Sequence, residues 1–96
     1  MKTINLTKEH RFNTEPSDEG FSYTLILIEE GNLITLHRVD SEFEKEEYLC
    51  AQGVLPVLKE LVSSIIWYYS NGCYELGDMY QNCLTLLIHK LYSRKE

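Results

Sequence analysis

An abrupt change from acidic to apolar residues divides this 96-residue chain near its middle. Between Asp40 and Glu47 five acids accompany a single base, Lys45, and the segment 48–69 that follows is largely apolar. Polar residues and a proline interrupt that segment before it reaches the roughly 18 uninterrupted apolar residues of a membrane span. The segment is therefore expected to form helices of a globular domain.

Length and charge limit the classes of protein to consider. The length predicts one domain, residues 1–96, with residues 1–20 partly flexible. The net charge is −6, and residues 15–47 hold ten acids against two bases. Such a field repels phosphate backbones and attracts basic surfaces, although it also serves ordinary solubility. We therefore expect no direct nucleic-acid binding and no membrane binding.

The first residues carry no apolar core of a signal peptide, and the three cysteines are odd in number and scattered. Together these features predict reduced thiols and a cytoplasmic location.

Two strands are expected at 21–28 and 33–39, around Glu30-Gly31-Asn32, because Gly31 and Asn32 tolerate the positive φ of a tight hairpin. One face of this hairpin is the better core candidate and carries Tyr23, Leu25, Leu27, Ile34, Leu36 and Arg38. The other face is also apolar and needs partial cover. Alternation at Ile4 and Leu6 predicts a third, N-terminal edge strand.

Ser41-Glu42-Phe43-Glu44 has the form of a capping box and predicts a short helix over 42–51. Gly53 and Pro56 then separate it from a second helix over 55–70, although one kinked helix is an alternative. Asn71-Gly72 ends that helix, and helical spacing continues over 75–93. The main apolar stripe of the second helix contains Leu55, Leu58, Val62, Ile65 and Tyr69, and Val57, Leu61 and Tyr68 widen it.

These elements predict an α+β fold: a small antiparallel sheet followed by two long helices and one short helix packed on one face. The helices carry more apolar surface than one face of such a sheet can cover. This excess is the physical reason to expect a protein partner, and a second copy of the chain is one candidate.

No pattern of catalytic or metal-binding residues stands out. Cys50, Cys73 and Cys83 are separated by 23 and 10 residues, whereas a zinc site needs ligand pairs a few residues apart. The five glycines are isolated, so no phosphate-binding loop is present. We therefore expect no enzyme activity, no catalytic residues, no metal and no cofactor.

Two groups of residues are candidates for partner binding. The first is an acidic ridge that can dock on a basic protein surface. The second is an aromatic group around the turn between the long helices, of the kind enriched at binding hot spots. The ridge consists of Asp40, Glu42, Glu44, Glu46 and Glu47, and the aromatic group of Trp67, Tyr68, Tyr69 and Tyr74.

Two functions follow from these groups. The first is a non-enzymatic inhibitor that docks through the ridge on a basic, nucleic-acid-handling protein. Bacteriocin and toxin immunity proteins and phage anti-defence proteins share this size, charge and layout, but no family motif is recognised. The alternative is a homo-oligomeric accessory domain, a homodimer for example, whose aromatic helices associate with the help of Leu58 or Val62.

Overall fold

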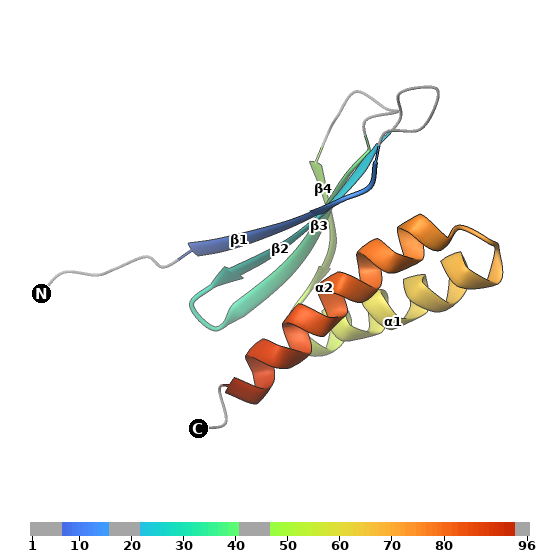
Figure 1. Ribbon diagram of the computed structural model, residues 1–96. Helices are drawn as coiled ribbons and strands as arrows, with labels where there is room; N and C mark the ends of the chain where they lie inside the picture. Colours follow the sequence, from blue (N-terminus) through green and yellow to red (C-terminus); the bar gives the residue numbers. More distant parts are fainter. Residues whose placement is uncertain (1–6, 16–21, 41–46, 94–96) are drawn as a thin grey trace, which may run out of the picture.

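The structure, a computed structural model, describes residues 7–15, 22–40 and 47–93. The strands are β1 (Thr7–Asn13), β2 (Tyr23–Glu30), β3 (Leu33–Asp40) and β4 (Glu47–Gln52), and the helices are α1 (Val54–Ser70) and α2 (Tyr74–Ser93). Both helices lie on the same side of the sheet, so the molecule has two layers (Figure 1). The predicted α+β fold class is confirmed.

The four strands form one antiparallel sheet in the order β1-β2-β3-β4. The predicted hairpin is present, with Glu30 opposite Leu33 and Gly31 at a φ of 63° in the turn. An N-terminal edge strand is also present, but it spans Thr7–Asn13. Ile4 and Leu6, which suggested this strand, lie outside the described residues.

The predicted short helix is wrong over residues 47–51, which belong to β4, and residues 42–46 lie outside the described part of the chain. Tyr48 pairs with Arg38 on β3, and an irregularity in the register after Leu36 leaves Cys50 as an extra residue on β4. Pairing with a strand ten residues earlier overrides the local helix signal here. A prediction based on capping chemistry does not contain that tertiary contact.

The two long helices match their predicted ranges to within one residue. The side chain of Asn71 donates a hydrogen bond to the carbonyl of Trp67 at 2.7 Å, and Gly72 follows with a φ of 77°. This left-handed residue ends α1 and allows α2 to return along it. Neither described helix is long and apolar enough to cross a membrane.

The core lies between the sheet and the helices. It uses the hairpin face that the alternation favoured, together with one side of each helix. Its buried members are Leu25, Leu27, Ile34, Leu36, Val57, Leu61, Met79, Tyr80, Cys83 and Leu87. The opposite face of the sheet is mixed: Ile26 is fully buried, whereas Leu49 is 52% exposed. The partial cover expected for that face is therefore complete at Ile26 and incomplete at Leu49.

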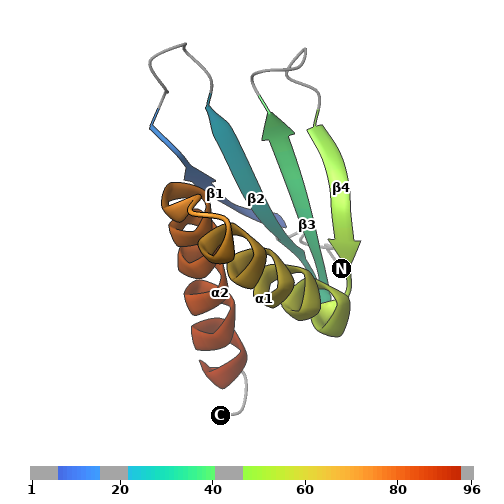
Figure 2. The same ribbon diagram turned by 90° about the vertical axis from the view of Figure 1, so that its right-hand side faces the viewer.

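Helix α1 lies over β3 and β4, and α2 lies over β1 and β2 (Figure 2). The side of α1 that meets the sheet is not the stripe expected from spacing. Val57 and Leu61 are fully buried, whereas Leu55 is 68% and Val62 is 44% exposed. Because α1 is apolar around most of its circumference, its spacing could not decide which side the sheet would cover.

Candidate functional site

The outer side of the helix pair, away from the sheet, is lined by apolar residues. Two adjoining hollows lie along it, one of about 390 Å³ and one of about 310 Å³, and Ile88 lines both. Leu55 lines neither hollow, but it lies seven residues, or two helical turns, before Val62 and therefore on the same side of α1. We call this surface the outer helix face; it consists of Leu55, Leu58, Val62, Ile65 and Ile66 from α1 and Leu84, Ile88, Leu91 and Tyr92 from α2.

The outer helix face is open to solvent at several of these residues. Leu55 is 68% exposed and Ile66 is 61% exposed. Figure 2 shows the helices meeting at their turn and diverging toward the other end of α2. No described strand or helix packs over this surface.

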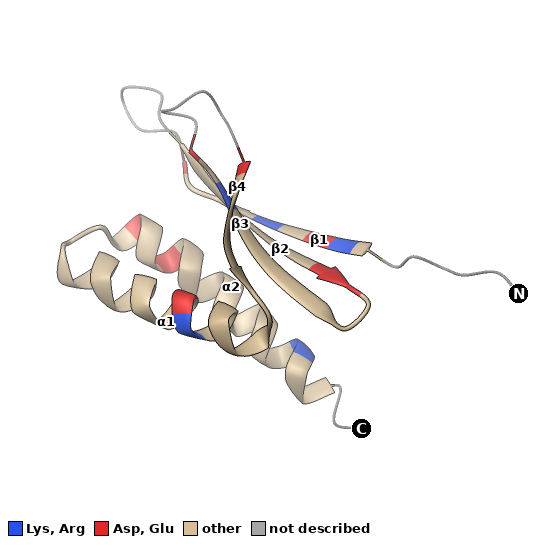
Figure 3. Cartoon of the chain, turned by 180° about the vertical axis from the view of Figure 1, so that it is seen from behind, with Lys and Arg blue, Asp and Glu red and all other residues tan. Residues whose placement is uncertain are grey.

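The two hollows of the outer helix face are lined by uncharged side chains, but exposed Lys59 lies four residues after Leu55 and shares that side of α1. Among the described residues that line its two hollows there is no Asp, Glu, Lys or Arg, and Gln81 and Thr85 supply the polar groups. Two charged residues of α2 are directed elsewhere: Glu75 accepts a hydrogen bond from the backbone of Glu15, and Lys90 pairs with Glu29 on β2. Figure 3 shows how sparse the charges of both helices are.

Arg38 forms a polar cluster at the helix-facing side of the sheet. Its Nε donates to Asp40 at 2.6 Å, and its Nη1 donates to the hydroxyl groups of Tyr68 and Tyr80. The guanidinium also lies 5.0 Å from the ring centroid of Tyr23. Burial alone would lower the pKa of Arg38, but the hydrogen bonds to Tyr68 and Asp40 raise it above its usual value. The cluster ties β3 to both helices and keeps the arginine charged.

A second polar cluster holds the far end of α2 against the sheet. Glu29 Oε2 lies 3.0 Å from Nζ of Lys90 and 3.0 Å from Nε2 of His10. Burial acts to raise the pKa of Glu29, but the hydrogen bonds to Lys90 and His10 outweigh it and leave that pKa below its usual value. Glu29 is therefore stabilised as a carboxylate that joins β1, β2 and α2.

The predicted acidic ridge falls largely on residues that the structure does not describe. Glu42, Glu44 and Glu46 are outside it, and the two described members are already engaged within the molecule. Asp40 binds Arg38, and Glu47 Oε2 lies 3.2 Å from Nδ1 of His37. The ridge as a docking surface stays a prediction.

The predicted aromatic group is split among different surroundings. Tyr68 turns inward to Arg38, and Tyr69 donates a hydrogen bond to Asp78. Trp67 and Tyr74 are 59% and 65% exposed. The rings nevertheless contact in pairs, with centroids 5.3 Å apart for Trp67 and Tyr68 and 6.1 Å apart for Tyr69 and Tyr74, and a partner-binding role for them stays a prediction.

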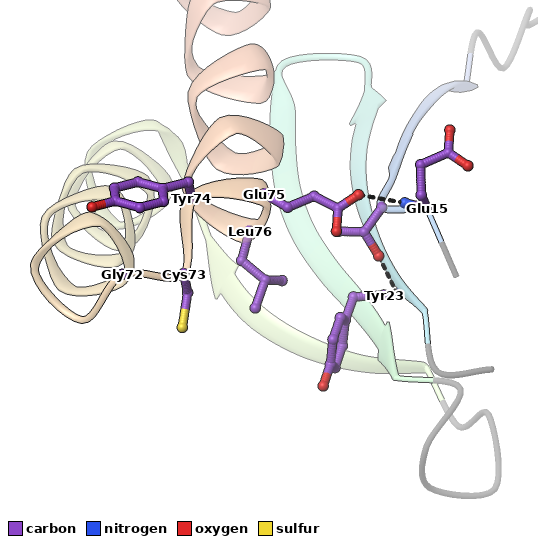
Figure 4. A pocket seen from close by; sticks show the side chains of 8 residues that line it. Glu15, Tyr23, Gly72, Cys73, Tyr74, Glu75 and Leu76 are labelled. Atoms are coloured by element: carbon purple, nitrogen blue, oxygen red, sulfur yellow. Dashed lines mark hydrogen bonds between the residues drawn. The ribbon is translucent and has the colours of Figure 1, made fainter. Parts of the chain in front are cut away.

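A separate pocket of about 380 Å³ lies where β1 and β2 meet the start of α2 (Figure 4). Tyr23, Leu76 and Cys73 line it, and the carboxylate of Glu75 crosses to accept the 2.8 Å hydrogen bond from Glu15 N–H. The Glu75 carboxylate thus anchors the end of β1 to α2. The lining has no histidine to activate the thiol of Cys73, so these residues form no nucleophile–base pair.

The remaining thiols lie in protected places. Burial raises the pKa of Cys83 to about 12, and burial with the nearby charge of Glu60 raises that of Cys50 to about 11. Thiols with such values are poor nucleophiles near neutral pH. Within the described ranges, no three His, Cys, Asp or Glu residues are grouped so that they could hold a metal ion.

Sequence reasoning named Leu58 and Val62 for a helix interface but missed Ile66, Leu84, Ile88 and Tyr92. The helical spacing of apolar residues in the sequence could have identified them. Leu55, Val62 and Ile66 recur at spacings of seven and four on α1, and Ile88 and Tyr92 are four apart on α2. Only the three-dimensional arrangement shows that these two rows lie side by side and face away from the sheet.

No family model matches the chain. No solved structure matches it. The chain is similar to an uncharacterized protein of Acanthamoeba polyphaga mimivirus, with 30% identity over 83 residues. The match covers 86% of this chain but 11% of the viral protein. In that protein the similar segment is thus a small part of a much longer polypeptide.

Proposed function

We propose that this domain is a non-enzymatic protein-binding domain that docks through the outer helix face. Its partner presents an apolar, uncharged protein surface. The observation that supports this proposal is the solvent exposure of Leu55, Val62, Ile66 and Ile88 on one largely apolar side of the helix pair.

The size of this surface sets it apart from scattered exposed residues. Aromatic side chains present roughly 150–250 Å² each when fully exposed, and the smaller aliphatic ones present less. With the observed exposures, between 43% and 71% for Leu55, Val62, Ile66, Ile88 and Tyr92, these residues leave on the order of 500 Å² of surface open. Patches of this size on soluble proteins commonly mark interaction sites.

Covering this surface contributes free energy comparable to the cost of association. At about 25 cal/mol per Å², removing some 500 Å² of apolar surface from water contributes on the order of 10 kcal/mol. The loss of translational and rotational freedom offsets about 4–15 kcal/mol of such a gain. Modest additional contacts around the rim are therefore sufficient for a stable complex.

Docking on a basic protein remains an expectation from the sequence, and the outer helix face adds no support to it. A basic surface placed there meets no described carboxylate in either hollow. The apolar face instead favours a partner whose contact surface has few charges, because burying an unpaired charge is costly.

The proposal is tested by placing a photo-reactive amino acid at single positions and irradiating the protein in extracts of its source cells. Position 88 reports on the outer helix face, and exposed Asn82, on another side of α2, is the control. We expect a discrete protein adduct from position 88 that disappears when Val62→Asp is added. Equal adducts from both positions, or none from position 88, would contradict the proposal.

A further inference from the structure

We infer that the occupant of the outer helix face is a second copy of this chain, so that two helix pairs pack face to face. This inference rests on the proposed function, because it names the partner of the same surface. Area, charge and the chemistry of the polar lining residues each support it.

The open area of the outer helix face approaches that of known interfaces. Stable protein–protein interfaces bury roughly 800 Å² on each partner. The exposed residues of the outer helix face supply on the order of 500 Å², and half-buried Leu58, Ile65, Leu84 and Leu91 line the same hollows. The face is thus close to the size that a small homodimer needs from each copy.

The acidic net charge of the chain opposes self-association. Two copies of a chain with a net charge of −6 repel each other unless their contact surfaces are neutral. The hollows of the outer helix face meet this condition, since none of their described lining residues is acidic or basic. The hollows of two acidic copies can therefore meet without juxtaposing carboxylates, while Lys59 adds a positive charge to the same side of α1 in each copy.

The polar lining residues suit a copy of themselves. The carbonyl oxygen of Gln81 accepts a hydrogen bond from the Tyr69 hydroxyl at 3.0 Å, but its amide can donate, and the hydroxyl of Thr85 can donate or accept. Across a two-fold axis each copy supplies both residues, so the Gln81 amide of one copy can donate to the Thr85 hydroxyl of the other. An isologous interface therefore leaves no charged group unpaired at its centre.

The test is the mass of the purified full chain by sedimentation equilibrium, from 1 to about 200 µM and at two salt concentrations. We expect association to twice 11.3 kDa that is kept or strengthened at high salt, because apolar burial is not screened. Ile66→Asp should weaken it at least about 30-fold, as removal of a hot spot does. Leu49→Asp is the matched control, since Leu49 is exposed to a similar degree on the other side of the sheet.

Three outcomes would overturn the inference: a monomer at all concentrations, association unchanged by Ile66→Asp, or association lost in Leu49→Asp alone. Circular dichroism of each variant must match that of the unmodified protein; Val62→Ser provides a milder second variant if Ile66→Asp does not fold. A strict monomer that still gives the adduct from position 88 with another protein would refute the second copy and leave the proposed function standing.

Discussion

The orientation of α1 can be tested by the same substitution at two positions of one helix. Val57 is fully buried against the sheet, and Val62 is 44% exposed on the outer helix face. Both are valines in the interior of α1, so Val57→Ala and Val62→Ala remove the same atoms and change helix propensity equally. Any difference between the two variants therefore reports which side of the helix the core covers.

The magnitudes follow from burial. Removing two buried carbon groups at Val57 costs about 1.6 kcal/mol in transfer free energy, and the cavity left behind adds to this. Alanine returns about 0.5 kcal/mol in helix propensity. We therefore expect Val57→Ala to lower the free energy of unfolding by about 2 kcal/mol and Val62→Ala to change it by less than about 0.5 kcal/mol.

Urea and thermal unfolding followed by circular dichroism measure this difference. For a domain of this size, Val57→Ala should lower Tm by roughly 8–16 °C, and Val62→Ala by less than about 4 °C. The protein should be dilute enough to be monomeric, because association through Val62 would otherwise add to its apparent stability. Equal losses, or a larger loss for Val62→Ala, would show that the predicted stripe faces the sheet and would refute the observed orientation.

Three further perturbations test the polar clusters and the helix contact. Arg38→Met should lower the free energy of unfolding by about 2–4 kcal/mol, because it leaves Asp40 without its ion pair; a loss below about 0.5 kcal/mol in urea titration would contradict this. Gly77→Ala should cost about 1 kcal/mol, because its new Cβ would lie 2.7 Å from the Tyr69 ring, and should become neutral or stabilising in a Tyr69→Ala background; equal effects in both backgrounds would count against that contact. Since the pKa of Glu29 in the folded protein lies below its ordinary value of 4.5, its contribution to stability is fully present above about pH 4.5 and is lost as pH falls through the folded pKa. Glu29→Gln should reduce the decrease in the free energy of unfolding at acid pH. A decrease as steep as that of the unmodified protein would refute this role of Glu29.

Rules that consider only neighbouring residues were sufficient to predict the hairpin turn, the end of α1 and the core face of β2 and β3. Gly31 in the hairpin turn and Asn71-Gly72 after α1 were readable because few residues satisfy those backbone conformations. Alternation in β2 and β3 also identified the core face, with Leu25, Leu36 and even Arg38 on it, because a one-residue slip would reverse every side chain.

The rest depended on contacts between distant segments. The strand β4 follows a stretch with good helix-capping residues, and only its pairing with β3 makes it a strand. In α1 the apolar residues surround most of the helix, so several rotations were equally compatible with its sequence. The candidate site arises from that same ambiguity, because the apolar side left over by the sheet is the outer helix face.

The most direct test of the central claim is an isotope-filtered NMR experiment on a mixture of ¹³C-labelled and unlabelled chains. Methyl groups of Leu55, Val62, Ile66 and Ile88 should show intermolecular contacts, while that of Leu49 should show none. Contacts confined to the outer side of the sheet, or no intermolecular contacts at concentrations where the protein associates, would contradict docking through the outer helix face.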